Sequence, residues 1–313
     1  MAVNFKGRSL LTLLDLSADD VRHLLDVSHL LKAERTSMKI EQRFLGRTLA
    51  MLFEKRSTRT RCAFETAFGE EGGCPVFLSS SDIQLGAKES IEDTARVLGR
   101  MFDAIMFRGF SQQTVETLAH YSGVPVYNGL TDMFHPTQVL ADLMTMEENF
   151  GQLSGLNFVY TGDGRNNMAN SLMVGCAIMG VNCTILAPET LYPEKELVDT
   201  AEQIAYDSGS ELNVTADAEE ALPDADVIYT DVWVSMGEEK KAQQRMKLLQ
   251  PYRVDEKMME RTGNPEVIFM HCLPAVKGNE VTVDVIEGKH SVVWDQAENR
   301  KHTIKGLMAA SLL

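Results

Sequence analysis

The sequence predicts an α/β protein made of two parallel-sheet domains joined by interdomain helices. Short apolar runs alternate with longer helical patterns along the chain, which indicates parallel sheets covered by helices. The 313 residues suffice for two domains of about 150 residues each. Polar residues follow the apolar runs, and a parallel sheet places its ligand sites at those strand ends.

In the first half, apolar runs predict strands over Thr48–Phe53 and residues 104–107, with helices starting near Ser57 and Gln112. The stretch Pro136–Phe150 predicts an amphipathic helix with proline at its first position, and it links the two halves.

In the second half, Asn157–Thr161 predicts a strand followed by a helix near Asn166. Three further strands are expected at residues 183–187, 226–230 and 267–270. A last helix after Asp295 is expected to pack back on the first half. The predicted domains are therefore residues 1–140, completed by residues 295–313, and residues 141–294.

Composition narrows the classes of partner. The formal charge of -15 disfavours nucleic acid and anionic membrane surfaces as partners. No apolar run approaches the 18 or so residues of a membrane span. The five cysteines are odd in number and lack a C-x-x-C pair, which predicts reduced thiols in a cytoplasm, with neither a disulfide frame nor a zinc site.

The first strand end carries a cluster of cations where a helix should start: Lys55, Arg56, Arg59 and Arg61. Three hydroxyls lie among them, on Ser57, Thr58 and Thr60. Each cation is unfavourable by roughly 0.3–1 kcal/mol beside the positive end of a helix, and a bound anion reverses that sign. A phosphate dianion fits this set, although the P-loop glycines are missing. The alternative is a solvated basic helix end.

Two further segments of the first half are candidates. Arg108 follows the second strand and places another guanidinium at a strand end, although a surface arginine is the simpler interpretation. His135 and Gln138 face each other across the start of the linking helix, as in a capping box. A capping role and a ligand role for His135 both stay open.

Candidates in the second half have different chemistry. Gly162-x-Gly164 weakly resembles a dinucleotide fingerprint, but Asn167 occupies the third glycine position. Asn166 and Asn167 could bind an amino acid's carboxylate and amine, or Asn166 could cap the helix. Asp231 follows a strand and suits a cationic substrate, unless it serves only a turn.

The segment His271-Cys272-Leu273-Pro274 follows the last predicted strand. Cys272 and His271 are neighbours, so on an extended chain their side chains should point to opposite faces and not meet. A binding role or plain burial of Cys272 is therefore expected. Proline holds Leu273 in extended or turn geometry, which frees its carbonyl for a ligand.

Four motifs together resemble those of the ornithine carbamoyltransferases. They are Ser57-Thr58-Arg59-Thr60-Arg61, His135-Pro136-Thr137-Gln138, Asp231-x-x-x-Ser235-Met236-Gly237 and His271-Cys272-Leu273-Pro274. The resemblance covers nearly the whole chain, and the Ser-Met-Gly loop distinguishes ornithine from other acceptors. It implies an active site in the cleft between the two domains, a cis Leu273-Pro274 bond, and no metal or cofactor.

The resemblance also implies the site residues. Those for carbamoyl phosphate are Ser57, Thr58, Arg59, Thr60, Gln84, Arg108, His135, Gln138, Cys272, Leu273 and Arg300. Those for L-ornithine are Asn167, Asp231, Ser235 and Met236. Gln84 belongs to a loop lent to the neighbouring subunit's site, which implies a homotrimer or a higher assembly of trimers with shared active sites.

The expected reaction is attack of the ornithine δ-amine on the carbamoyl carbon, through a tetrahedral intermediate, with loss of phosphate. Arg59 would serve the phosphate, and Arg108, Thr60 and His135 the carbonyl oxygen. Freeing a lysine-like amine of its proton at pH 7 costs roughly 4–5 kcal/mol. Asp231 and Cys272 are the candidates for orienting that amine.

Three other functions compete. A carbamoyltransferase for aspartate would need cations around the second carboxylate of that substrate, whereas Asp231 and Met236 offer an anion and a thioether. One for putrescine would not need Asn167 and Ser235, because putrescine has no α-carboxylate to bind. A nicotinamide dehydrogenase would use Gly162 and Gly164 but leaves the basic cluster unexplained. A protein that binds carbamoyl phosphate without turnover would not need the full polar set.

Overall fold

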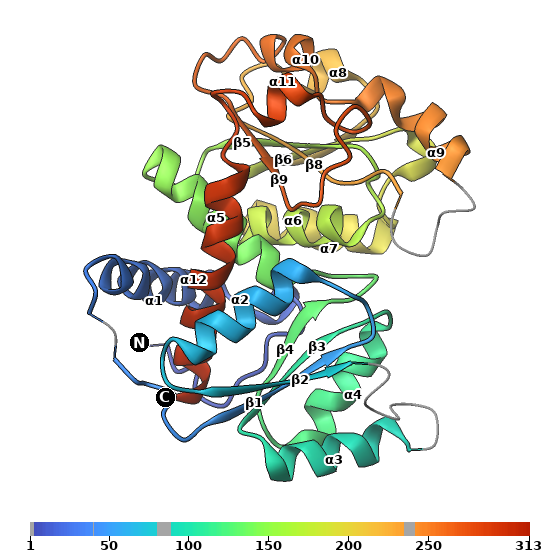
Figure 1. Cartoon of the computed structure of the whole chain (residues 1–313). Coiled ribbons are helices and arrows are strands. Elements are labelled where there is room, and N and C mark those ends of the chain that lie inside the picture. The colour runs from blue at the N-terminus through green and yellow to red at the C-terminus, as the bar shows by residue number, and fades with distance from the viewer. Residues whose placement is uncertain (1–2, 40, 80–88, 235–241) are drawn as a thin grey trace. The chain divides into compact units, whose positions relative to one another are not determined.

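The computed structural model describes residues 3–39, 41–79, 89–234 and 242–313, which form two compact units (Figure 1). Unit 1 comprises residues 1–144 and 298–313, and unit 2 comprises residues 145–297. Helix α5 (Pro136–Phe150) and helix α12 (Val293–Leu312) each contribute residues to both units. Among the described residues, no helix combines the length and the apolar character needed to cross a membrane.

Unit 1 is built on a parallel sheet with the strand order β2-β1-β3-β4. Its strands are β1 (Thr48–Phe53), β2 (Cys74–Ser79), β3 (Ala104–Arg108) and β4 (Val126–Leu130). Its helices, besides α5 and α12, are η1 (Leu13–Asp15), α1 (Ala18–Thr36), α2 (Thr58–Gly69), α3 (Ile91–Met101) and α4 (Gln112–Ser122).

Alternation along the strands of unit 1 sends side chains to two covered faces. Ala50, Leu52 and Ile105 belong to a core that α3 and α4 complete. On β4, the ring of Tyr127 stacks on Phe64 of α2 and its hydroxyl bonds to Ser311 of α12. Helices α2 and α12 therefore cover the opposite face, as Figure 1 shows. Both faces are buried, as parallel sheets require.

Unit 2 has a five-stranded parallel sheet in the order β7-β6-β5-β8-β9. Its strands are β5 (Asn157–Thr161), β6 (Asn182–Leu186), β7 (Leu212–Thr215), β8 (Val227–Thr230) and β9 (Ile268–His271). Its helices are α6 (Asn167–Ile178), η2 (Glu189–Leu191), α7 (Lys195–Ser208), α8 (Ala218–Ala221), α9 (Ala242–Leu249), η4 (Gln250–Tyr252), α10 (Glu256–Glu260) and α11 (Val283–Ile286).

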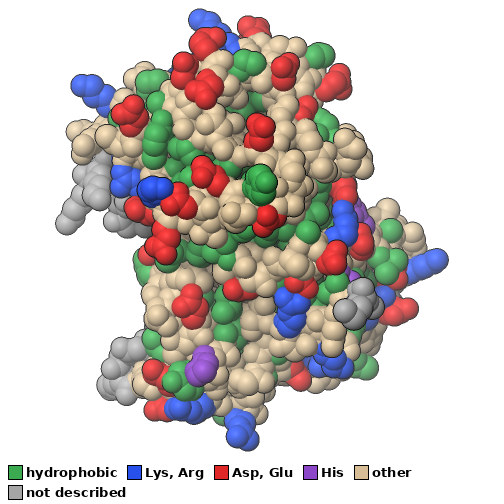
Figure 2. Space-filling model, turned by 180° about the vertical axis from the view of Figure 1, so that it is seen from behind, with side chains coloured by type: hydrophobic (Ala, Val, Ile, Leu, Met, Phe, Trp, Pro, Cys, Tyr) green, Lys and Arg blue, Asp and Glu red, His purple; other side chains and the backbone are tan. Residues whose placement is uncertain are grey.

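The two faces of this second sheet are also covered. Val159, Ile228 and Phe269 pack in a core with residues of α8, α10 and α11. Tyr160 and Tyr229, one position further along β5 and β8, stack their rings on the other face. The surface in Figure 2 carries dispersed acidic side chains with basic ones among them, in keeping with the net acidic charge.

The predicted fold class is confirmed, and the predicted strands appear within one residue at each end. Three strands among the described residues, β2, β4 and β7, were not expected from the sequence. The last helix begins at Val293 rather than after Asp295. In both sheets the polar segments singled out from the sequence follow the carboxyl ends of strands.

Candidate functional site

The start of helix α2 is the centre of the polar cluster in unit 1. Ser57 is the N-cap, and its hydroxyl accepts a hydrogen bond from the amide of Thr60 at 3.2 Å. Strand register places Arg108 beside Phe53, the last residue of β1. The Arg108 guanidinium therefore reaches the same point and donates to Thr60 Oγ1 at 3.1 Å. A buried cation thus lies at the positive end of a helix, where an anion would be stabilised.

Arg300 brings a second buried guanidinium to the same hydroxyl from helix α12. Its Nη2 lies 3.5 Å from Thr60 Oγ1, and its Nη1 donates to Gln138 Oε1 at 2.5 Å. Thr60 therefore accepts from two arginines that are far apart in the sequence. We call the group formed by Arg59, Thr60, Arg108, His135, Gln138 and Arg300 the guanidinium cluster.

His135 is the neutral member of the guanidinium cluster. Burial lowers the pKa of its imidazole well below the ordinary value, and the positive charges of Arg300, Arg108 and Arg59 lower it further. The imidazole is therefore uncharged at pH 7 and can donate or accept a hydrogen bond without adding a fourth charge. Arg59 is half-buried in the first turn of α2 and is close enough to act electrostatically on this ring.

The capping-box interpretation of His135 and Gln138 is wrong. The backbone amide of Gln138 bonds to the carbonyl of His135, but its side chain turns away to other partners. Gln138 Nε2 donates to Asp142 Oδ1 at 2.8 Å, and Gln138 Oε1 accepts from Arg300. Both ends of the amide are thus used inside the cluster.

The other cations and hydroxyls of the first motif have different surroundings. Lys55 forms an ion pair with Asp132, and Arg61 pairs with Glu65 one turn along α2 at 2.9 Å. Arg56 and Thr58 are exposed. The solvated-helix interpretation therefore fits Arg61 and Arg56, whereas Arg59 belongs to the guanidinium cluster.

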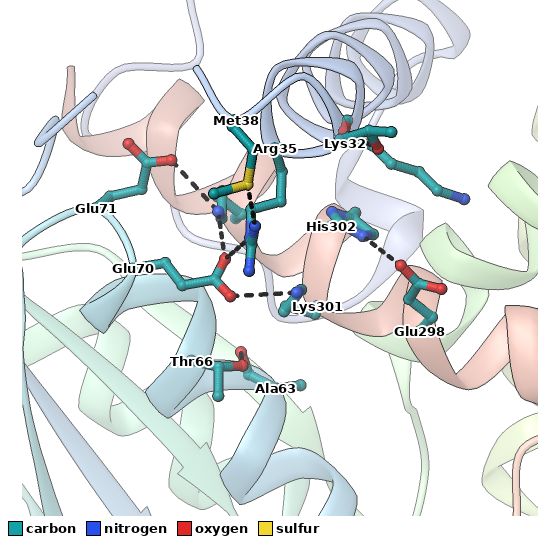
Figure 3. A network of polar contacts seen from close by, with 12 residues as sticks. Lys32, Arg35, Met38, Ala63, Thr66, Glu70, Glu71, Glu298, Lys301 and His302 are labelled. Carbon is teal, nitrogen blue, oxygen red and sulfur yellow. Dashed lines mark hydrogen bonds and ion pairs between the residues drawn. The ribbon is translucent and has the colours of Figure 1, made fainter. Parts of the chain in front are cut away.

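An ionic network holds helix α12, which carries Arg300, against the far end of α2 (Figure 3). Lys305 is 1% exposed and lies 2.9 Å from a Glu70 oxygen and 3.3 Å from a Glu71 oxygen. Lys301, next to Arg300, also pairs with Glu70. Burial alone would raise the pKa of Glu70, but these lysines lower it to about 2. The network therefore stabilises the register that brings Arg300 to Thr60.

Unit 2 assembles a different cluster around Asp231, the residue after β8. Its Oδ1 accepts from the Cys272 thiol at 3.1 Å and from the Val232 amide at 2.7 Å. Its Oδ2 lies 3.4 Å from the Asn166 amide nitrogen. Burial raises the pKa of this carboxyl, and the hydrogen bonds from the Cys272 thiol and the Val232 amide oppose that rise. A buried carboxylate of this kind suits a cationic partner.

The expectation that His271 and Cys272 point apart is wrong. Nitrogen, sulfur and carboxylate atoms of His271, Cys272 and Asp231 all lie within 4.8 Å of one another. The strand ends at His271, so the alternation of faces ends there too, and Leu273 adopts a positive φ of 57°. The Leu273 amide then donates back to His271 Nδ1 at 2.8 Å. Local curvature, rather than extension, sets these side chains.

A buried acid, Glu280, lies beside the His271 ring. Glu280 is fully buried, and its Oε1 lies 3.3 Å from His271 Nε2. The His271 backbone amide donates to Gln296 at 2.9 Å. We call Asp231, His271, Cys272 and Glu280 the acid–thiol cluster. Its first three members have the donor atoms of a metal site, although Nδ1 of His271 already accepts from the Leu273 amide.

Of the two asparagines at the start of α6, only Asn166 caps the helix, as the capping alternative predicted. Asn166 is the N-cap, and its side chain accepts from the Ala169 amide at 2.8 Å. Its NH2 group donates to the Tyr160 hydroxyl at 2.7 Å. Asn167 is the first helical residue and is half-buried. The contact of Asn166 with Asp231 thus holds the start of α6 beside that carboxylate.

The remaining predicted site residues fall partly outside the described residues, and some residues near the two clusters were not predicted. Leu273 precedes a cis peptide bond to Pro274, as the family resemblance implied. Gln84, Ser235 and Met236 lie outside the described residues. Three supporting residues escaped the sequence analysis: Asp142, Tyr160 and Glu280. Only Asp142 had a usable signal, because it lies four residues after Gln138 on one helix and so shares its face.

Known proteins are similar to this chain over its whole length. Residues 8–148 match the family model described as aspartate/ornithine carbamoyltransferase, carbamoyl-P binding domain, and residues 154–311 match the Asp/Orn binding domain. The ornithine carbamoyltransferases of Caldanaerobacter subterraneus subsp. tengcongensis and Thermotoga maritima are each 64% identical over 313 residues, covering 100% of both chains. A solved structure of ornithine carbamoyltransferase from Pyrococcus furiosus superimposes with a TM-score of 0.96 at 45% identity, over 99% of this chain and 98% of that one. The chain therefore belongs to the aspartate/ornithine carbamoyltransferase family.

Proposed function

We propose that this chain transfers the carbamoyl group of carbamoyl phosphate to the δ-amine of L-ornithine, giving L-citrulline and phosphate. The observation that supports this most strongly is the convergence of Arg108 and Arg300 on Thr60 at the start of α2, beside a neutral His135. Buried like charges repel each other, and a phosphate dianion would compensate them. The family match supports the same chemistry.

The guanidinium cluster would bind carbamoyl phosphate. Arg59, the Ser57 N-cap and the free amides at the start of α2 would bind the leaving phosphate. Arg108, Thr60 and His135 would donate to the carbonyl oxygen, where negative charge develops as the tetrahedral intermediate forms. These donors act on charge that is largest in the transition state, so they would raise kcat as well as affinity.

The acid–thiol cluster would bind and orient ornithine in the same reaction. Asp231 supplies a carboxylate for the δ-amine, and the Cys272 thiol fixes one of its oxygens. Asn167, with Ser235 and Met236, would bind the amino acid end. We further propose that the Leu273 carbonyl accepts from the carbamoyl NH2.

The test is an acceptor assay with carbamoyl phosphate and three amines at equal concentration: L-ornithine, L-aspartate and putrescine. Formation of citrulline at a kcat/KM at least 100-fold above that of either other product is expected. A preference for aspartate or putrescine would overturn the proposed substrate, while turnover with none of the three would favour a binding protein. Ser235→Ala should raise the KM for ornithine and leave that for carbamoyl phosphate unchanged.

We also propose a homotrimeric assembly, or a higher assembly of trimers, in the cytoplasm. The resemblance of the motif around Gln84 supports shared active sites. The five cysteines form no disulfides in the structure, which suits a cytoplasmic protein. Light scattering would give the mass. Mixing inactive Gln84→Ala and Arg59→Ala subunits should restore part of the activity, because one kind of site in the mixed trimers would be intact.

A further inference from the structure

Asp142 is a buried carboxylate that the proposed reaction does not use. It is fully buried on helix α5, one turn after Gln138, and its Oδ1 accepts from Gln138 Nε2 at 2.8 Å. Both residues lie in the part of α5 that belongs to unit 1. A carboxylate in such an environment is costly unless it is paired or hydrogen-bonded.

The two partners of Gln138 determine which way its amide points. An ionised carboxylate can only accept hydrogen bonds, and a guanidinium can only donate them. Arg300 must therefore face the carbonyl end, where the contact is 2.5 Å, and this leaves the NH2 end to donate to Asp142. The amide orientation thus follows from the chemistry of its partners, whichever way the atoms are drawn.

This orientation places an acceptor among donors. The guanidinium cluster offers N–H groups from Arg59, Arg108 and Arg300, and Thr60 Oγ1 already accepts from two of these arginines. Gln138 Oε1 accepts from Arg300 and retains a second lone pair. Phosphate and carbonyl oxygens need donors, but the NH2 of a carbamoyl group needs an acceptor of this kind.

We propose that Asp142 is a positioning residue that holds the Gln138 carbonyl toward the ligand and so selects a carbamoyl group over an acetyl group. This inference rests on the proposed function. Acetyl phosphate has the same charge and nearly the same shape as carbamoyl phosphate, with CH3 in place of NH2. A site whose buried polar group is left unpaired by an analogue rejects that analogue strongly.

The experiment measures dissociation constants of the full-length protein for carbamoyl phosphate, acetyl phosphate and inorganic phosphate by calorimetry. The wild type should prefer carbamoyl over acetyl phosphate at least tenfold. Asp142→Leu, which removes the acceptor, should bring this ratio close to one. Asp142→Asn keeps a carbonyl but allows the pair to flip, so the ratio should fall two- to fivefold. Affinity for inorganic phosphate should change less than threefold in both variants.

A matched control is available on helix α7. Gln203 Nε2 donates to Asp207 Oδ1 at 3.0 Å with the same four-residue spacing, but this pair is exposed. Asp207→Leu should leave all three affinities unchanged. If Asp142→Leu does not fold, Asp142→Asn decides alone.

An unchanged carbamoyl-to-acetyl ratio in the folded Asp142 variants would overturn the inference, even if both affinities fell together, because a uniform loss indicates a merely structural role. Failure of the wild type to bind either inorganic phosphate or carbamoyl phosphate would instead overturn the proposed function. The two failures are thus distinguishable.

Discussion

The strand ends of unit 1 hold buried cations around a neutral histidine, whereas those of unit 2 hold a buried carboxylate, a thiol and a histidine backed by a second acid. In unit 1, Arg108 and Arg300 converge on the start of α2. In unit 2, Asp231 accepts from Cys272 and faces Asn166 at the start of α6. Similar sheets thus present opposite charge at their ligand ends.

The difference teaches how one architecture can serve two substrates. The parallel sheet supplies the place, since the carboxyl ends of neighbouring strands meet at one edge. The residue at the strand end supplies the sign of the charge: Arg108 is the last residue of β3, and Asp231 directly follows β8. A dianion and an aminium group would each find a site that is incomplete without it.

The largest effect is expected from the ionic network that holds α12 in unit 1. Lys305→Met leaves Glu70 and Glu71 without a buried cation and should lower the free energy of unfolding by about 3 kcal/mol. Urea denaturation measures this. The control is Lys195→Met in unit 2, whose pair with Asp199 is exposed, and this variant should unfold like the wild type. Equal midpoints for all three proteins would contradict the prediction.

Removing a guanidinium from the guanidinium cluster should nearly abolish catalysis. Arg59→Ala is expected to reduce kcat/KM for carbamoyl phosphate by roughly 10²–10³-fold, because it removes a donor to the leaving phosphate. Steady-state kinetics at saturating ornithine give the value.

Arg61→Ala is the matched control on the same helix, since Arg61 is exposed and paired with Glu65. It should retain at least half of the activity. If the two variants were equally impaired, the basic helix start would act through its total charge, and the assignment of Arg59 to the site would fail.

The negative charge of Asp231 in unit 2 can also be removed by a single substitution. Asp231→Asn keeps the volume but loses the charge, which should raise the KM for ornithine about ten- to hundredfold, the cost of a hydrogen bond to a charged group. Binding of inorganic phosphate should not change. Asp226→Asn is the control, because Asp226 precedes the same strand at its other end, where it accepts from Asn157. Weakened phosphate binding in the Asp231 variant would contradict the assignment of Asp231 to ornithine alone.

The smallest effect concerns the neutral histidine. Burial and three arginines keep the pKa of native His135 well below that of the unfolded chain, so the unfolded state binds the extra proton as pH falls below about 6.5. Stability should therefore decrease by about 1 kcal/mol between pH 7.5 and pH 5.5 on account of His135. Urea titrations of wild type and His135→Asn should show a shallower pH slope in the variant. Parallel slopes would mean that native His135 titrates normally.

Much of the fold could be predicted from the sequence because its signals are local. Apolar runs such as Thr48–Phe53 mark buried strands, and proline at the start of Pro136–Phe150 marks a helix. The residues after each strand, among them Arg108 and Asp231, could be named as candidates for the same reason. Their spatial neighbours could not, because periodicity carries no information on register between distant segments.

The sequence by itself determined the order of elements and the chemical types at each strand end, since propensity, patterning and capping depend on near neighbours. Only the tertiary structure showed that Arg300 and Arg108 share the Thr60 hydroxyl, that Asp142 bonds to Gln138, and that Glu280 lies beside His271. It also showed that Arg61 has its own partner and that His271 and Cys272 lie together. Each of these depends on which surfaces pack, and packing is a property of the whole folded unit.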